Sequence, residues 1–353
     1  MPSILYIGEA SLGSASADRA NALERLGASV VRLPVPQFER GLWSQLDRQS
    51  ARRLQLGTWI TRFNSAVVEA GSKHYDIIWL DKPWMLKPRT VQELRQHTSY
   101  LVMFNNDNPW GPLERGRWRL LLGAIRHTDL VITPRSANVP DYLAKGARLV
   151  RIADFGFAPE RQVPPSDEVT NPKLFDVSFI GTATADGAQV RPHRAHFLSD
   201  VANRLPGRIT IFGDGWSKFA RNLKAVKNIG PAQMGDAYNQ AIWSSKVSLS
   251  FVNWAQADET SHRAFEITAC RGLLLAERSP RLETSFRENV EALFFSSVDE
   301  CVEKLRSALN NERDRLSISE AGHQRSMSSG YDNDSRLRQV ILQTNKLRDY
   351  FGV

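Results

Sequence analysis

Short apolar runs alternate with amphipathic stretches along the first half of the chain. Between the first two runs, the stretch 16–27 places Ala20, Leu23 and Leu26 on one helical face and ends in a glycine, as a crossover helix does. This alternation is typical of βαβ units, which assemble into a parallel sheet covered by helices. The strands that it predicts are residues 3–8, 29–33, 76–81, 99–105, 129–134 and 147–153.

A second series of apolar runs repeats the pattern and predicts a second parallel sheet. After residue 296 the pattern becomes helical, and Ser297 and Glu300 have the spacing of a capping box at a helix start. Two sheets of this kind indicate an α/β protein with two Rossmann-like domains and a cleft between them. The strands predicted for the second domain are residues 175–181, 208–213, 247–252, 272–277 and 292–296.

The segment between the two series has the composition of a linker. Residues 158–173 are rich in proline and charge and show no periodicity. The length of 353 residues also exceeds what one hydrophobic core usually supports. The bounds predicted from these features are 1–160 for the first domain, 161–172 for the linker and 173–332 for the second domain.

Composition narrows the class of protein. The chain is 42% hydrophobic and 24% charged, as in soluble globular proteins, and no apolar run approaches the roughly 20 residues of a membrane-spanning helix. The N-terminus lacks the basic region of a signal peptide. Only two cysteines occur, Cys270 and Cys301. We therefore expect a cytoplasmic protein with neither a disulfide framework nor a cysteine metal site.

The net charge of +8 implies an anionic partner. A nucleotide, a phospholipid surface or a nucleic acid would each be such a partner. No basic tail, zinc-finger spacing or ribonucleoprotein motif occurs, so we expect no nucleic acid.

The segment 39–64 mixes Trp43, Leu46 and Trp59 with several arginines. This pattern favours a solvated helix, and it leaves open a peripheral association with anionic lipid at the inner face of the membrane.

Three loops of the first domain carry candidate ligand-binding residues. After the first strand, Gly8, Gly13 and Ser14 precede a helix, where they predict either a ligand contact or a tight turn with a serine N-cap. The glycine spacing is not that of a dinucleotide fingerprint. Asp81 and Asp107 each end a later strand, where α/β proteins bind ligands. Asp107 is the better candidate, because its asparagine neighbours suit Asx-turns more than the aspartate does.

The second domain carries a candidate diphosphate cradle. Gly181 and Thr182 end its first predicted strand, and Arg191, which we prefer to Arg194, follows a small-residue loop. Guanidinium groups pair bidentately with phosphate oxygens. Gly213 and Gly215 flank an aspartate after the next strand, which by itself indicates a turn.

The stretch "ADETSHRAFEITACRGLLLAE", residues 257–277, concentrates the most chemistry. Thr260 or Ser261 can cap a helix from His262 to Cys270, whose free amides would receive a diphosphate. A carboxylate on the same helix, Glu266, can accept both ribose hydroxyls. Asp258, just before the helix, can accept hydroxyls of a sugar, and Arg263 begins the helix beside the diphosphate position. The competing interpretation of Glu266 is a structural ion pair with Arg263.

These motifs, taken in order, resemble a known family. "DVSFIG", "IFGDGW", "FNNDNPW" and "SHRAFEITACRGLLLAERSP" are similar to CgeB-type (spore-maturation-protein-like) glycosyltransferases, relatives of the retaining glycogen-synthase-like enzymes. The resemblance implies a GT-B fold in which a C-terminal helix, 333–353, crosses back to the first domain. It implies two glutamates, the first binding the sugar and the second the ribose; Glu266 matches the second, and the shorter Asp258 occupies the first position. It also carries Asp107 over as a catalytic candidate.

The resemblance also implies the reaction. A nucleotide-diphosphate sugar would give its sugar to an acceptor hydroxyl of a glycan, glycolipid or protein, with retention and with no metal or other cofactor, as an EC 2.4 hexosyltransferase of bacterial polysaccharide or glycoconjugate synthesis. Two alternatives stay open. One is a catalytically silent nucleotide-sugar-binding or scaffold protein, and the other is a nucleotide-sugar epimerase of the same fold.

Overall fold

The computed structural model describes residues 1–11, 13–35, 47, 50–51, 54–112, 116–166, 173–183 and 193–353. The chain forms two compact units. The first joins Met1–Asp154 to Asp334–Val353, and the second is Phe155–Asn333. The change of unit thus comes before the proline-rich segment 161–172 that we expected as the linker, because Phe155 and Phe157 are buried in the core of the second unit.

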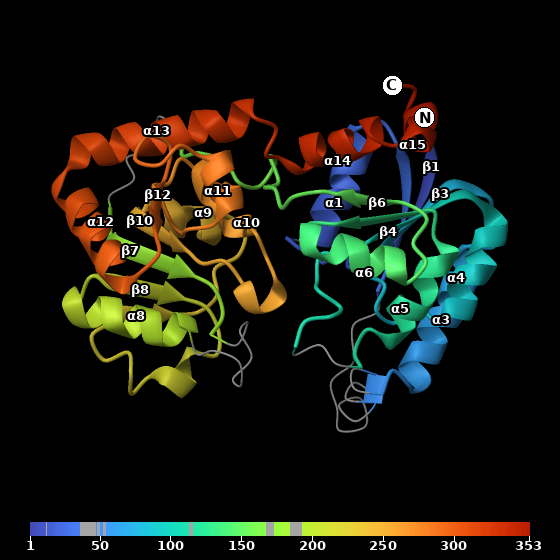
Figure 1. Cartoon of the computed structure of the whole chain (residues 1–353), viewed down its shortest axis with the longest axis horizontal. Coiled ribbons are helices and arrows are strands. Elements are labelled where there is room, and N and C mark those ends of the chain that lie inside the picture. Colours follow the sequence, from blue (N-terminus) through green and yellow to red (C-terminus); the bar gives the residue numbers. More distant parts are fainter. Residues whose placement is uncertain are drawn as a thin grey trace. The chain divides into compact units, whose positions relative to one another are not determined.

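The first unit contains a six-stranded parallel sheet in the order β2-β1-β3-β4-β5-β6 (Figure 1). All six strands predicted for this domain are present. Its elements are β1 Ser3–Gly8, α1 Ala15–Arg25, β2 Ser29–Pro34, α3 Thr58–Ala70, β3 Tyr75–Asp81, α4 Pro88–Leu94, β4 Thr98–Phe104, α5 Arg119–Ala124, β5 Leu130–Thr133, α6 Val139–Ala144, β6 Val150–Ile152, α14 Asn333–Leu342, which begins at the last residue of the other unit, and α15 Asn345–Phe351, with 3-10 turns η1 Arg95–His97, η2 Ile125–His127 and η3 Ser136–Asn138.

Successive strand residues of the first sheet enter different cores, as a pleated strand requires. Leu5 and Ile7 pack with α3, α4, α5 and α6, whereas Ile4 and Tyr6 pack with α1, α14 and α15. The C-terminal segment therefore returns to the first sheet, which confirms the predicted crossing. Arg25 of α1 also binds Asp334 of α14 at 2.5 Å.

The second unit repeats the architecture with the strand order β12-β11-β10-β7-β8-β9, again all parallel. The five predicted strands are present, and β9 was missed because three residues, of which two are exposed, carry no strand periodicity. The elements are β7 Phe175–Ile180, α8 His193–Arg204, β8 Ile209–Phe212, η4 Trp216–Phe219, β9 Asn228–Gly230, α9 Asp236–Trp243, β10 Ser245–Ser250, η5 Trp254–Gln256, α10 His262–Ala269, β11 Leu274–Glu277, α11 Pro280–Ser285, β12 Leu293–Phe295, α12 Val298–Asn310 and α13 Glu312–Ser328.

Local signals in the second unit agree with its helix ends. Ser297 caps α12 by accepting the Glu300 amide, as the capping-box spacing predicted. Both cysteines are free and buried, which agrees with the expected lack of a disulfide. No helix within the described ranges is both long enough and apolar enough to cross a membrane.

Candidate functional site

The second sheet changes its direction of winding at β7. The chain goes from β7 to β8 on one side, and β10 later takes the place on the other side. Ligands of open α/β sheets bind at the carboxyl ends of strands beside such a switch point. The loop after β7 and the start of α10, which follows β10, both lie at this edge because all the strands are parallel.

Three side chains form a cluster, in which Tyr238 of α9 and Glu266 of α10 are buried and Arg263 of α10 is partly exposed. Arg263 Nη1 is 2.6 Å from Glu266 Oε2, and Tyr238 Oη of α9 donates to the same oxygen at 2.8 Å. The Arg263 guanidinium also lies 4.6 Å from the centre of the Tyr238 ring, and its Nε donates to the main-chain carbonyl of Ile180 at 3.1 Å. Arg263 therefore ties the helix start to the end of β7.

Glu266 is ionised, and only one of its two carboxylate oxygens accepts hydrogen bonds from the described residues. Burial opposes its ionisation, but the charge of Arg263 and the two hydrogen bonds outweigh this effect and lower the pKa of Glu266 below its ordinary value. Within the described part of the chain, no donor reaches Glu266 Oε1. One carboxylate oxygen accepts two donors, so Oε1 can accept two ligand hydroxyls without breaking the cluster. The ion pair and the ligand role, which were alternatives from sequence, are compatible in the structure.

The N-terminus of α10 has no side-chain cap. Ser261 has the extended backbone of an N-cap residue, but its Oγ lies 2.8 Å from Ser250 Oγ. The expected serine cap is therefore wrong, because Ser250 at the end of β10 takes the hydroxyl. Thr260 is buried beside it, and no side chain caps the helix in its place. His262 packs against Phe155 with the two ring centres 4.3 Å apart, and the amides of the first turn, which no side chain caps, are available to an anion.

Asp258 lies on a tight loop between β10 and α10. Its amide donates to the Asn253 carbonyl at 3.2 Å, and Ala257 takes a left-handed φ of 55°. Asp258 is buried, with 9% of the residue exposed. The structure thus places Asp258, Thr260, Ser261, His262, Arg263 and Glu266 in one continuous segment at the switch point.

A further carboxylate supports the same loop. Glu277, at the end of β11, accepts the Val252 amide at 3.1 Å and the Trp254 Nε1–H at 2.9 Å. The Trp254 side chain remains 44% exposed. Sequence analysis did not identify Glu277, Trp254 or Tyr238 as site residues. Glu277 ends a predicted strand and could have been found by that position, whereas nothing local marks Tyr238, whose partner is far along the chain.

The glycines of the expected cradle support backbone packing. A Cβ on Gly213 would lie 2.0 Å from the Gly181 carbonyl oxygen, and Gly213 has a φ of 150°. Gly181 O also accepts the Trp216 indole N–H at 2.9 Å. Gly215, with a φ of 81°, precedes η4. Thr182 is exposed beside them, and Arg191 lies outside the described residues.

The glycine and serine residues of the first unit form a capped turn. Ser14 Oγ accepts the Ala17 amide at 3.1 Å, so the serine N-cap interpretation is confirmed. Gly13 has a φ of 84°. A Cβ on Gly8 would lie 2.5 Å from Ser16 Oγ, which explains the glycine without a ligand.

Asp81 and Asp107 differ in their freedom to meet a ligand. Asp81 is buried, and its two oxygens accept hydrogen bonds from Arg19 and Tyr6. Asp107 is 28% exposed and forms an ion pair with Lys82 Nζ at 2.6 Å. Lys82 was not identified from sequence, although it directly follows Asp81 at a strand end.

The asparagines around Asp107 form the turns expected of them. Asn105 Oδ1 accepts the Asp107 amide at 3.3 Å, and Asn108 Oδ1 accepts the Trp110 amide at 3.0 Å. Both are Asx-turns. Because these side chains make the turn, the carboxylate of Asp107 is left to Lys82 and to solvent.

Comparisons with known proteins match a family model to part of the chain and solved structures to its fold. Residues 191–341 match the family model described as "Glycosyl transferase-like". No curated protein sequence matches the chain significantly.

Solved structures match over nearly the whole length. HepE of Anabaena in complex with UDP-glucose has 15% identity and a TM-score of 0.64 and covers 97% of this chain and 99% of its own. Sucrose-phosphate synthase of Thermosynechococcus elongatus has 12% identity, a TM-score of 0.67 and the same coverages. A Listeria monocytogenes protein designated a UDP-N-acetylglucosamine 2-epimerase has 10% identity and a TM-score of 0.55 and covers 99% and 96%. The fold is GT-B, as we expected.

Proposed function

We propose that the protein transfers a sugar from a nucleotide-diphosphate sugar to an acceptor hydroxyl. The bond between the anomeric carbon and the β-phosphate oxygen breaks, the acceptor oxygen bonds to that carbon, and the nucleoside diphosphate leaves and takes up the proton of the acceptor hydroxyl. Retention, independence of metal and a CgeB-type specificity belong to the same proposal. The match of residues 191–341 to the "Glycosyl transferase-like" model supports it, because that segment contains the switch-point residues.

The observation that carries the proposal is the fixed, ionised Glu266. Arg263 and Tyr238 both donate to its Oε2. The carboxylate is therefore held in place, and Oε1 can accept hydrogen bonds from a ligand. A single carboxylate oxygen has two lone pairs and can accept from both hydroxyls of a vicinal pair. Ribose carries such a pair, so we assign Glu266 to the ribose.

The diphosphate would bind at the start of α10. The uncapped amides of His262 and Arg263 and the positive end of the helix favour an anion there. The Arg263 guanidinium adds a charge that persists, because its pKa is raised: burial opposes the charged form, but the nearby Tyr238 and Glu266 outweigh that effect. In transfer these groups would stabilise the charge of the departing diphosphate.

The two remaining acids divide between sugar and acceptor. Asp258 precedes the diphosphate site by a few residues and suits a contact to the sugar. Asp107 belongs to the first unit. Although it pairs with Lys82, its side chain is partly exposed, so its carboxylate can meet an acceptor hydroxyl. The neighbour HepE binds UDP-glucose, so UDP-sugars are the first donors to test.

Thermal unfolding with UDP-, GDP-, ADP- and dTDP-sugars tests the donor site. We expect one base class to raise the melting temperature, and we expect Glu266→Ala to lose most of that rise. Glu303→Ala, an exposed glutamate of α12, is the matched control. Undiminished binding by Glu266→Ala, or no response to any donor, would overturn the assignment.

Incubation of the donor separates the proposal from its alternatives. Sugar transfer to an acceptor pool, detected by mass spectrometry, supports the proposal. Isomerised nucleotide-sugar formed without any acceptor would instead establish an epimerase, an activity that the designation of the Listeria neighbour names. Binding with neither transfer nor isomerisation would establish a silent binding protein.

A further inference from the structure

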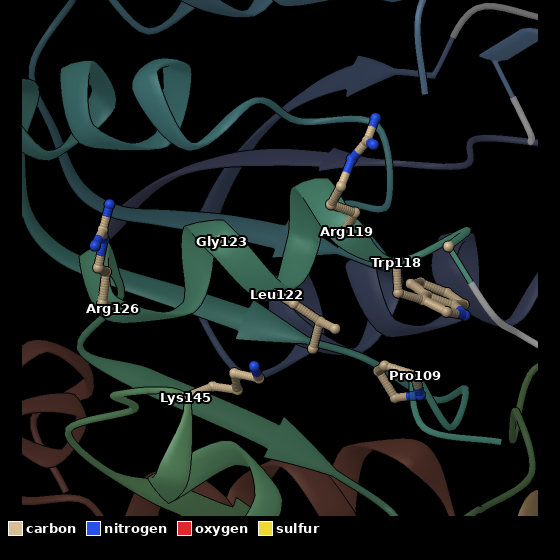
Figure 2. A pocket seen from close by; sticks show the side chains of 8 residues that line it. Pro109, Trp118, Arg119, Leu122, Gly123, Arg126 and Lys145 are labelled. Atoms are coloured by element: carbon tan, nitrogen blue, oxygen red, sulfur yellow. The ribbon is translucent and has the colours of Figure 1, made fainter. Parts of the chain in front are cut away.

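A pocket of about 570 Å³ lies on the first unit, outside the residues discussed above (Figure 2). Its volume is within the range of small-molecule sites. Helix α5 supplies one wall, the loop before α5 supplies one end, and the end of α6 supplies the opposite wall. The lining residues are Pro109, Gly116, Trp118, Arg119, Leu122, Gly123, Arg126 and Lys145.

The lining joins an apolar surface to positive charge. Figure 2 shows Leu122 and the Lys145 side chain approaching each other across the pocket, with Pro109 and Trp118 at one end and Arg126 at the other. Trp118 is 1% exposed, so the apolar end is a fixed part of the core.

The cations of this pocket have no acidic partner among the residues that the structure describes. Arg119 Nη2 donates to the Leu54 carbonyl at 2.5 Å, and Arg126 Nε reaches only the neighbouring His127 ring at 3.4 Å. Lys145 and Arg126 are exposed and pair with no carboxylate of the described ranges. Unneutralised cations at a concave surface attract an anion.

We propose that this pocket binds a phosphate monoester that carries an alkyl chain. Lys145 binds the phosphate, Arg126 adds positive charge at one end of the pocket, and Leu122 contacts the chain. Both parts are necessary, because single solvent-exposed ion pairs contribute little and the apolar contact gives no selectivity for charge. The proposal does not depend on the function proposed for the second unit.

Calorimetric titration of the full chain with monomeric octyl phosphate tests the proposal. We expect saturable binding, and we expect the double substitution Lys145→Gln with Arg126→Gln to weaken it at least tenfold. Lys73→Gln, at an exposed lysine that does not line the pocket, is the control and should bind as the wild type does. Equal melting temperatures of the variants show that loss of binding is not loss of folding.

Three further ligands distinguish the source of the affinity. Octyl glucoside lacks the charge and inorganic phosphate lacks the chain, so we expect neither to bind as octyl phosphate does. Equal binding by either one, or octyl phosphate binding that survives the double substitution, would overturn the proposal. Pelleting with phosphatidic acid vesicles without binding of monomeric octyl phosphate would also overturn it, because the interaction would then belong to a charged surface.

Discussion

Arg19 holds Asp81 through two parallel hydrogen bonds, from Nε to Oδ2 at 2.7 Å and from Nη2 to Oδ1 at 2.8 Å. Tyr6 Oη donates to Oδ2 at 2.7 Å, and the guanidinium lies 4.1 Å from the centre of the Phe104 ring. Burial and the charge of Asp81 raise the pKa of Tyr6, so its hydroxyl stays protonated as a donor. This buried pair joins α1 to the end of β3.

Asp81→Asn is expected to lower the free energy of unfolding by about 3–5 kcal/mol, because Arg19 would be left as a buried charge without its partner. Chemical denaturation measures the effect. A loss below about 1 kcal/mol would show that the pair contributes little to the stability of the first unit.

Asp107→Asn is expected to change stability little and sugar transfer strongly. Its ion pair with Lys82 is partly exposed, so its loss should cost less than about 1 kcal/mol of stability. If Asp107 meets the acceptor, the variant binds the donor normally but transfers its sugar far more slowly. Unchanged kcat in this variant would remove Asp107 from the catalytic residues.

Acid is expected to weaken the second unit through Glu266. Because the folded protein holds the pKa of Glu266 below its ordinary value of 4.5, the ionised group stabilises the fold above that pH. This stabilisation is lost as the pH falls through the pKa of the folded state. Denaturation of wild type and Glu266→Gln should therefore differ by a constant amount from pH 8 to about pH 5 and converge at lower pH. A difference that grows as the pH falls would contradict this.

Trp254 is expected to report donor binding by its fluorescence. The residue is 44% exposed on the loop that leads to Asp258, and the indole N–H donates to Glu277. The chain has nine tryptophans, so the test is the difference between the wild type and Trp254→Phe. We expect a change in emission on addition of donor in the first protein and most of that change to be absent in the second. Equal changes in both would place Trp254 away from the ligand.

Chelation of divalent cations is expected to leave transfer unchanged. In the proposed site, the amides at the start of α10 and the Arg263 guanidinium neutralise the diphosphate. Transfer rates measured before and after dialysis against EDTA test this. A large loss that Mg²⁺ or Mn²⁺ restores would assign the neutralisation to a metal.

Much of the fold could be predicted because its signals are local. Every predicted strand is present, since a run of apolar residues between turn signals depends only on neighbours in sequence. The exceptions have physical causes. β9 is too short and too exposed to show a period, and the expected cap at Ser261 failed because Ser250, on another element, binds its hydroxyl.

The sequence by itself determined the two parallel sheets, the helix that carries Glu266 and the order of the acidic residues. Only the tertiary structure decided which carboxylate oxygens already accept hydrogen bonds from the protein. Arg19 binds Asp81, and Tyr238 and Arg263 bind one oxygen of Glu266. The physical reason is separation along the chain. Periodicity and capping act over a few residues, whereas the partner that neutralises a buried carboxylate comes from another element, 62 positions away for Asp81 and 28 for the Tyr238 contact.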